Sequence, residues 1–136
     1  MNRLPGTILS IESNEHLSLV DVMAGQMTYT AMLMETPDNA PYLKVGNQVE
    51  ILFKETEVSM AKNLSGAISL RNIVRCKVQT IRSGDILCEV VLNRDGQILT
   101  SIITQRAVKR LELKEGDEVD AMIKANEVSL VETRIR

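Results

Sequence analysis

The chain has 136 residues, of which 44% are hydrophobic and 25% charged, a composition typical of a globular protein. No apolar run is long enough to cross a membrane, and the N-terminus lacks a basic segment followed by an apolar stretch, so we expect no membrane partner and a cytoplasmic location. The net charge is −2, and one His and two Cys leave little for metal or nucleophilic chemistry. Cys76 and Cys88 alternate in phase with apolar neighbours, which predicts buried thiols.

An internal repeat divides the chain. Residues 43–60 return at 113–130 without a gap and with eight identities among eighteen pairs, an offset of seventy residues. We therefore expect two modules, residues 1–64 and 65–136. The first holds four Lys/Arg against eight Asp/Glu and the second twelve against ten, so the balances are −4 and +2. We therefore expect an anionic partner to bind to the second module.

Alternating polar and apolar residues predict the strands of each module in chain order. The first three are expected at residues 6–12, 17–23 and 27–34, and their counterparts at 76–82, 86–92 and 98–103. The turn before the third strand reads as one residue longer in the second module, which predicts a small loop insertion. A Lys-x-Gly turn then introduces a fourth strand, and Glu-Val-Ser begins a short fifth one.

A short helix is expected between the third and fourth strands. Thr104 stands in N-cap position before residues 105–111, and the counterpart, residues 36–40, begins Thr-Pro, with Pro suited to a first helical position. Five short antiparallel strands with one helix predict an all-β fold: two tandem OB-like five-stranded Greek-key barrels, each with one short helix.

The second module contains the segments Ser69-Leu70-Arg71-Asn72, Gly96-Gln97, Ile102-Ile103-Thr104, the Lys-Glu-Gly-Asp-Glu-Val run from 114 and the Ile-Lys-Ala-Asn-Glu-Val run from 123. These segments resemble the Mop (TOBE-type) module of molbindins. Two such modules in tandem resemble the di-Mop molbindins. The resemblance implies a cytoplasmic protein that binds molybdate or tungstate, assembled as a homo-oligomer, with a trimer expected.

The resemblance also implies an oxyanion site formed between modules of neighbouring subunits. A buried dianion needs several aimed donors and nearby positive charge. The expected ligands are Ser69, Leu70, Arg71, Thr104, Lys124 and Ala125, and weaker candidates are Asn72, Lys54, Glu55 and Ala107. Catalytic residues and a metal bound other than as its oxyanion are not expected.

The chain departs from the family pattern at several positions. Ala107 stands where the family often has a Ser. In the first module Met1 aligns with Arg71, Met34 with Thr104 and Pro37 with Ala107, so that Lys54 alone survives. We therefore expect the first module to have lost most side chains of this kind of site.

Other readings of the same residues stay open. Arg71, Lys54 and Lys124 could be solvated surface residues. The basic residues Arg106, Lys109 and Arg110 could form a nucleic-acid patch, but the chain has two Tyr, one Phe and no Trp to stack on bases, so no nucleic-acid partner is expected. The expected function is storage, buffering or delivery of the oxyanion by a protein that is not an enzyme. The alternative is a ligand-sensing module that regulates a partner, either a transcription regulator or a transporter ATPase.

Overall fold

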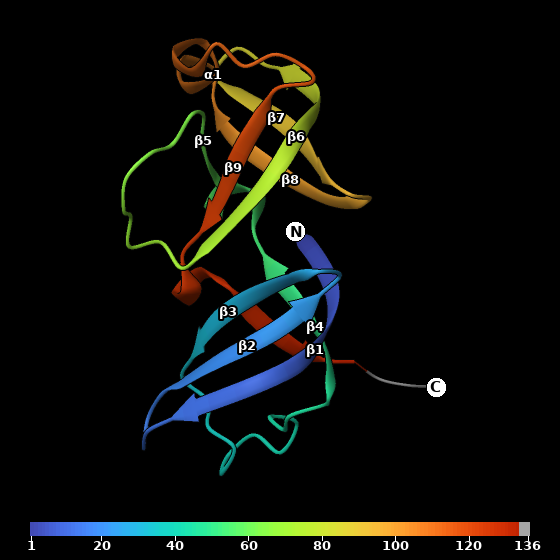
Figure 1. Cartoon of the computed structure of the whole chain (residues 1–136), viewed down its shortest axis with the longest axis vertical. Helices are drawn as coiled ribbons and strands as arrows, with labels where there is room; N and C mark the ends of the chain where they lie inside the picture. Colours follow the sequence, from blue (N-terminus) through green and yellow to red (C-terminus); the bar gives the residue numbers. More distant parts are fainter. Residues whose placement is uncertain (134–136) are drawn as a thin grey trace. The chain divides into compact units, whose positions relative to one another are not determined.

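The computed structural model describes residues 1–133 and contains two five-stranded antiparallel sheets (Figure 1). One sheet has the strand order β10-β4-β1-β2-β3, formed by Ser129–Glu132, Gln48–Phe53, Asn2–Ser13, Ser18–Ala24 and Met27–Leu33. The other has the order β5-β9-β6-β7-β8, formed by Ser59–Ala61, Glu118–Ile123, Asn72–Ser83, Leu87–Arg94 and Gln97–Thr104. The single α-helix in residues 1–133, α1, spans Gln105–Leu111. The all-β, OB-like expectation is confirmed.

The final strand of each repeat joins the sheet built by the other repeat. β5, from the first repeat, pairs with β9, and β10, from the second, pairs with β4. The two compact units are consequently Met1–Phe53 with the chain from Lys124 onward (unit 1), and Lys54–Ile123 (unit 2). The expected boundary after residue 64 follows the sequence repeat, whereas the compact units divide after Phe53 and after Ile123. A sequence repeat shows which segments are alike, but not which sheet each segment joins.

The predicted strands are present, and two of them are longer than expected. β1 and β6 begin at Asn2 and Asn72, four residues before the alternating pattern becomes clear. Both strands carry a bulge at the same place, between Ile8 and Ser10 and between Val78 and Thr80. A bulge bends a strand and increases its twist, which lets one long strand serve two parts of a curved sheet.

The predicted insertion before the third strand is wrong. Ala24 pairs with Met27 and Arg94 with Gln97, so both hairpins have two-residue loops. The offset of seventy residues therefore holds through the third strand as well.

The helix expected over residues 36–40 is also wrong, because a hydrogen-bonded turn takes its place. The Thr36 carbonyl accepts from the amides of Asn39 (3.1 Å) and Ala40 (2.8 Å), and the Asn39 side chain accepts from the Thr36 amide (2.9 Å). These local bonds satisfy the backbone without a helix. Only unit 2 has an α-helix within the described residues.

The two cores are filled differently. Unit 1 buries Tyr29 and Phe53, whose rings stack with centroids 6.4 Å apart. The matching positions in unit 2 are the aliphatic residues Leu99 and Ile123, both fully buried. Cys76 and Cys88 are buried free thiols, as predicted. No helix among residues 1–133 has the length and apolar character needed to span a membrane.

Candidate functional site

The segment Ser69-Leu70-Arg71 is held at the entrance to β6. The side chain of Asn72, the first residue of that strand, is buried and donates a hydrogen bond to the carbonyl of Ile123 (3.1 Å). Asn72 thus fixes the start of β6 against the end of β9. Ser69 and Arg71 are exposed, and neither side chain has a hydrogen-bond or ion-pair partner within residues 1–133. Their donors are therefore available to a ligand.

Thr104 lies at the junction of β8 and α1. Its Oγ1 accepts a hydrogen bond from the Ala107 amide (3.0 Å), which caps the helix, while the Gln105 amide donates to the Ile86 carbonyl (2.7 Å). The amides of Gln105 and Ala107 are thus already occupied. A threonine hydroxyl that accepts one bond can still donate another, so Thr104 keeps one donor. Ala107 contributes neither a hydroxyl nor a free amide.

Thr104 and Arg71 lie at opposite ends of unit 2. Thr104 pairs with Leu87, next to the pairing of Cys88 with Ser83 at the far end of β6, whereas Arg71 precedes Asn72 at its beginning. The eleven residue steps from Asn72 to Ser83 correspond to roughly 35 Å along the strand. Figure 1 shows the same separation, with α1 at the end of the unit opposite to the start of β6. One copy of unit 2 cannot bring both residues to one small anion.

Lys54 and Lys124 have matching local geometry. Each precedes a short 3-10 helix, Glu55–Glu57 or Ala125–Glu127, and each carbonyl accepts from the amide three residues later at 2.9 Å. Both lysine side chains are exposed. Lys54 and Glu55 belong to unit 2, together with Ser69, Arg71 and Thr104, whereas Lys124 and Ala125 belong to unit 1. Lys124 directly follows Ile123, which pairs with Asn72, so Lys124 and Arg71 stand at the same end of the β6–β9 pair, whereas Lys54 directly follows Phe53, which pairs with Asn2 of β1.

Known proteins resemble this chain in both sequence and structure. Residues 68–130 match the family model of the TOBE domain. Molybdenum-pterin-binding protein 1 of Clostridium pasteurianum is 41% identical over 66 residues, which cover 48% of this chain and 97% of that protein. The solved structure of ModG, described as a cytoplasmic molybdate-binding protein and determined with molybdate bound, superposes with a TM-score of 0.89 at 32% identity, covering 95% of this chain and 94% of that chain.

The chain belongs to the molbindin family. Its two Mop-type modules match ModG over nearly the whole of both chains. A further relative, the molybdenum-pterin-binding protein MopB of Rhodobacter capsulatus, is 37% identical over 70 residues, which are 51% of this chain and 26% of MopB. The chain thus spans about a quarter of MopB.

Outside the molbindin motif, each unit carries an open groove at the same position. The groove in unit 2 encloses about 600 Å³ and the one in unit 1 about 500 Å³. The first is lined by the charged residues Arg75, Lys77, Arg94, Asp95 and Glu118, whereas among residues 1–133 the second has only Glu50 as a charged lining residue. The family motif predicts neither groove, because the charged residues lie within strands or in the hairpin turn between two strands.

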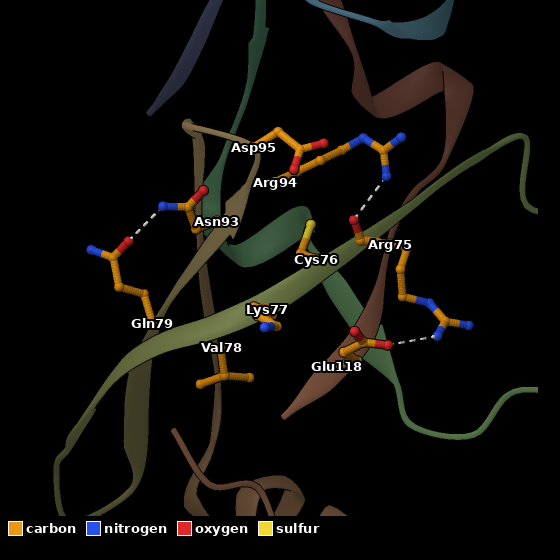
Figure 2. A pocket seen from close by; sticks show the side chains of 9 residues that line it. All are labelled: Arg75, Cys76, Lys77, Val78, Gln79, Asn93, Arg94, Asp95 and Glu118. Atoms are coloured by element: carbon orange, nitrogen blue, oxygen red, sulfur yellow. Dashed lines mark hydrogen bonds and ion pairs between the residues drawn. The ribbon is translucent and has the colours of Figure 1, made fainter. Parts of the chain in front are cut away.

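Two charged residues of the groove in unit 2 pair with each other, because Arg75 Nη1 lies 3.6 Å from Glu118 Oε2, and Arg94 donates to the Arg75 carbonyl at 3.0 Å (Figure 2). Arg75 Nε also lies 2.9 Å from Asp120 Oδ1. The carboxylate of Asp120 raises the pKa of Arg75 above its usual value. Cys76 lines this groove, and burial raises the pKa of its thiol to about 11, so the thiol is neutral and a poor nucleophile near neutral pH. This groove offers less free positive charge than its composition suggests.

The sequence did not indicate the role of one partly buried cation, Lys62. The Lys62 ammonium lies 3.0 Å from an Asp117 carboxylate oxygen and also donates to the carbonyls of Leu111 (3.1 Å) and Glu112 (3.0 Å) at the C-terminal end of α1. The repeat contains an indication of this difference, because the residue seventy positions after Lys62 is Glu132, which has the opposite charge.

Proposed function

We propose that this molbindin binds molybdate and serves its storage, buffering or delivery in the cytoplasm. The observation that carries the proposal is the similarity to ModG over nearly the full length of both chains, at 32% identity and a TM-score of 0.89. That protein is described as a cytoplasmic molybdate-binding protein. The relatives are described by what they bind, and the proposed activity is accordingly binding without catalysis.

The exposed donors of unit 2 fit the chemistry of a tetrahedral dianion. Arg71 offers a planar set of N–H donors, Ser69 a hydroxyl, and Lys124, which directly follows the strand partner of Asn72, a third polar group with a charge. Charge-assisted hydrogen bonds to such an anion are shorter and stronger than neutral ones. We propose Ser69, Leu70 and Arg71 as the centre of the site, with Thr104 and a lysine from position 54 or 124 completing it.

The separation of Thr104 from Arg71 supports an oligomer. Since one unit cannot direct both side chains at one anion, a site that uses both needs residues from another copy of the chain. We propose a homo-oligomer in which neighbouring copies complete each site, with a trimer as its form. Tungstate, a tetrahedral dianion of almost the same size, is proposed as a second ligand.

The sensing alternative has less support. The match to ModG accounts for nearly all of this chain with two Mop-type modules, and no observation on the described residues adds a regulatory element. We therefore keep the binding function as the proposal.

Two measurements test this function. Isothermal calorimetry should show micromolar or tighter molybdate binding that a hundredfold excess of sulfate barely disturbs, because donors placed for the longer metal–oxygen bond leave a smaller anion with unmet contacts. Phosphate, partly protonated at neutral pH, meets donors but no acceptor for its proton. Comparable affinity for sulfate would contradict the proposal.

Native mass spectrometry with and without molybdate tests the assembly. The expected spectrum contains a trimer that gains mass in units of the anion. A monomer that binds molybdate with the same affinity would overturn the shared site while leaving the binding function intact.

A further inference from the structure

We propose that Lys62 selects the sheet that β5 joins, and thereby determines the exchanged pairing of the two repeats. The two candidate strands are nearly interchangeable in their own sequences, because β5 begins Ser-Met and β10 begins Ser-Leu. Their registers are also equivalent: Ser59 pairs with Met122 of β9 as Ser129 pairs with Leu52 of β4. The strands themselves therefore do not distinguish the exchanged arrangement from the one in which each repeat keeps its own strand.

The residues at one matched position near the ends of the two strands do distinguish them. Lys62 directly follows β5, and the residue at the matching position of the second repeat is Glu132, the last residue of β10. In unit 2, Lys62 is only 26% exposed and lies between the Asp117 carboxylate and the carbonyls of Leu111 and Glu112. A cation at the C-terminal end of a helix, beside a carboxylate, is favourable on both counts.

Unit 1 satisfies the same position without a cation. Asn47 stands where unit 2 has Asp117, and its side-chain amide donates to the Tyr42 carbonyl (2.9 Å), the counterpart of the Glu112 carbonyl. Aspartate has no donor when ionised, so in unit 2 that carbonyl needs a donor from elsewhere, and Lys62 supplies it.

The unexchanged arrangement would disturb unit 2. Glu132 would then take the place of Lys62 beside Asp117 and the C-terminal end of α1, which brings like charges together and leaves two carbonyls without their donor. Lys62 would move to Asn47, which carries no charge.

Disulfide trapping in the full-length chain tests this proposal. Ser59→Cys with Met122→Cys reports the exchanged pairing, and Ser59→Cys with Leu52→Cys reports the unexchanged one. Cross-strand partners are close enough for a disulfide after mild oxidation. Peptide mapping by mass spectrometry identifies the bridge, and a non-reducing gel separates bridges within one chain from bridges between chains. The parent chain should form the 59–122 bridge at least tenfold faster than the 59–52 bridge.

The decisive variant combines Lys62→Glu with Glu132→Lys. It gives the cation to the other strand and should make the 59–52 bridge the faster one, whereas Lys44→Glu, a charge reversal at an exposed turn lysine, should leave the preference unchanged. Continued dominance of the 59–122 bridge in the combined variant would show that Lys62 does not select the pairing. Dominance of the 59–52 bridge in the parent chain would overturn the exchange itself.

Discussion

Units 1 and 2 pair their strands in the same register but differ in the side chains at matched positions. Asn2 pairs with Phe53 as Asn72 pairs with Ile123, and both first strands carry a bulge at the equivalent position. At matched positions, however, an aromatic residue replaces an aliphatic one in the core, and charged residues in the groove of unit 2 replace neutral ones. The backbone arrangement thus tolerates wide variation in side chains, and the chemical difference between the units lies in a few matched positions that can be exchanged by mutation.

The largest expected effect concerns the core of unit 1. Phe53→Ala removes a ring that is 1% exposed and stacks on Tyr29, so we expect a loss of about 3–5 kcal/mol in the free energy of unfolding. Urea unfolding followed by circular dichroism measures the loss. The matched variant Ile123→Ala removes a smaller side chain from unit 2 and should cost less. A greater loss for Ile123→Ala would mean that the aromatic pair does not dominate the core of unit 1.

The second effect concerns ligand binding. Arg71→Met gives the second module the residue found at the matching position of the first, Met1, and removes an exposed charged donor that is otherwise unpaired. We expect molybdate affinity to fall roughly ten- to a hundredfold, about 1.5–3 kcal/mol. Calorimetry measures the change. Arg82→Met is the control, because the Arg82 side chain is 83% exposed and makes only a 4.0 Å ion pair with Glu89. Equal losses for the two variants would indicate general electrostatics and not a site at Arg71.

A large part of the fold could be predicted from the sequence. The period-two alternation defined six strands, and the gapless repeat of residues 43–60 defined the turn and strand that follow in each module. The turn at residues 36–40 could not be predicted, because Thr-Pro suits both a helix start and a turn, and only the bonds of Asn39 decide between them. The strand exchange could not be predicted from the repeat, since the two final strands are nearly identical.

The motif names the candidate ligands residue by residue but not what each one does in the fold. Ser69 and Arg71 are exposed. Asn72 was expected as a weaker ligand, yet it is buried and holds β6 to β9, a role that a polar residue in sequence cannot reveal. The sequence grouped Lys124 with Arg71 because they belong to one repeat. The pairing of Asn72 with Ile123 keeps Lys124 and Arg71 at the same end of β6 and β9.

A third difference between the units is steric. Gly6 occupies the position matched by Cys76, and a Cβ atom at Gly6 would lie 2.6 Å from Val22 Cγ1 and 2.9 Å from the Met23 carbonyl oxygen. Gly6→Ala should therefore destabilise the protein by about 1–3 kcal/mol through overpacking. Thermal unfolding measures the loss. Cys76→Ala, where the backbone already accommodates a Cβ, should cost less, and an unchanged melting temperature for Gly6→Ala would show that unit 1 can widen at this point.

The smallest expected effect is the pH dependence that Asp117 gives to unit 2 and Asn47 does not give to unit 1. The Lys114 amide, which donates to the Asp117 carboxylate at 2.9 Å, and then Lys62 lower the pKa of Asp117 below its usual value. A carboxylate whose folded pKa is lowered stabilises the fold above its unfolded pKa of about 3.9, and this contribution is lost as the pH falls through the folded value. Asp117→Asn removes the charge but keeps an oxygen that can accept from the Lys114 amide. We therefore expect urea midpoints of the parent chain to fall more between pH 7 and pH 3 than those of Asp117→Asn, whereas Glu115→Gln, at an exposed neighbouring carboxylate, should behave like the parent. Equal falls for the parent and Asp117→Asn would mean that Lys62 is held by the helix carbonyls alone, and the Asp117 carboxylate would then contribute nothing to the difference between the two units.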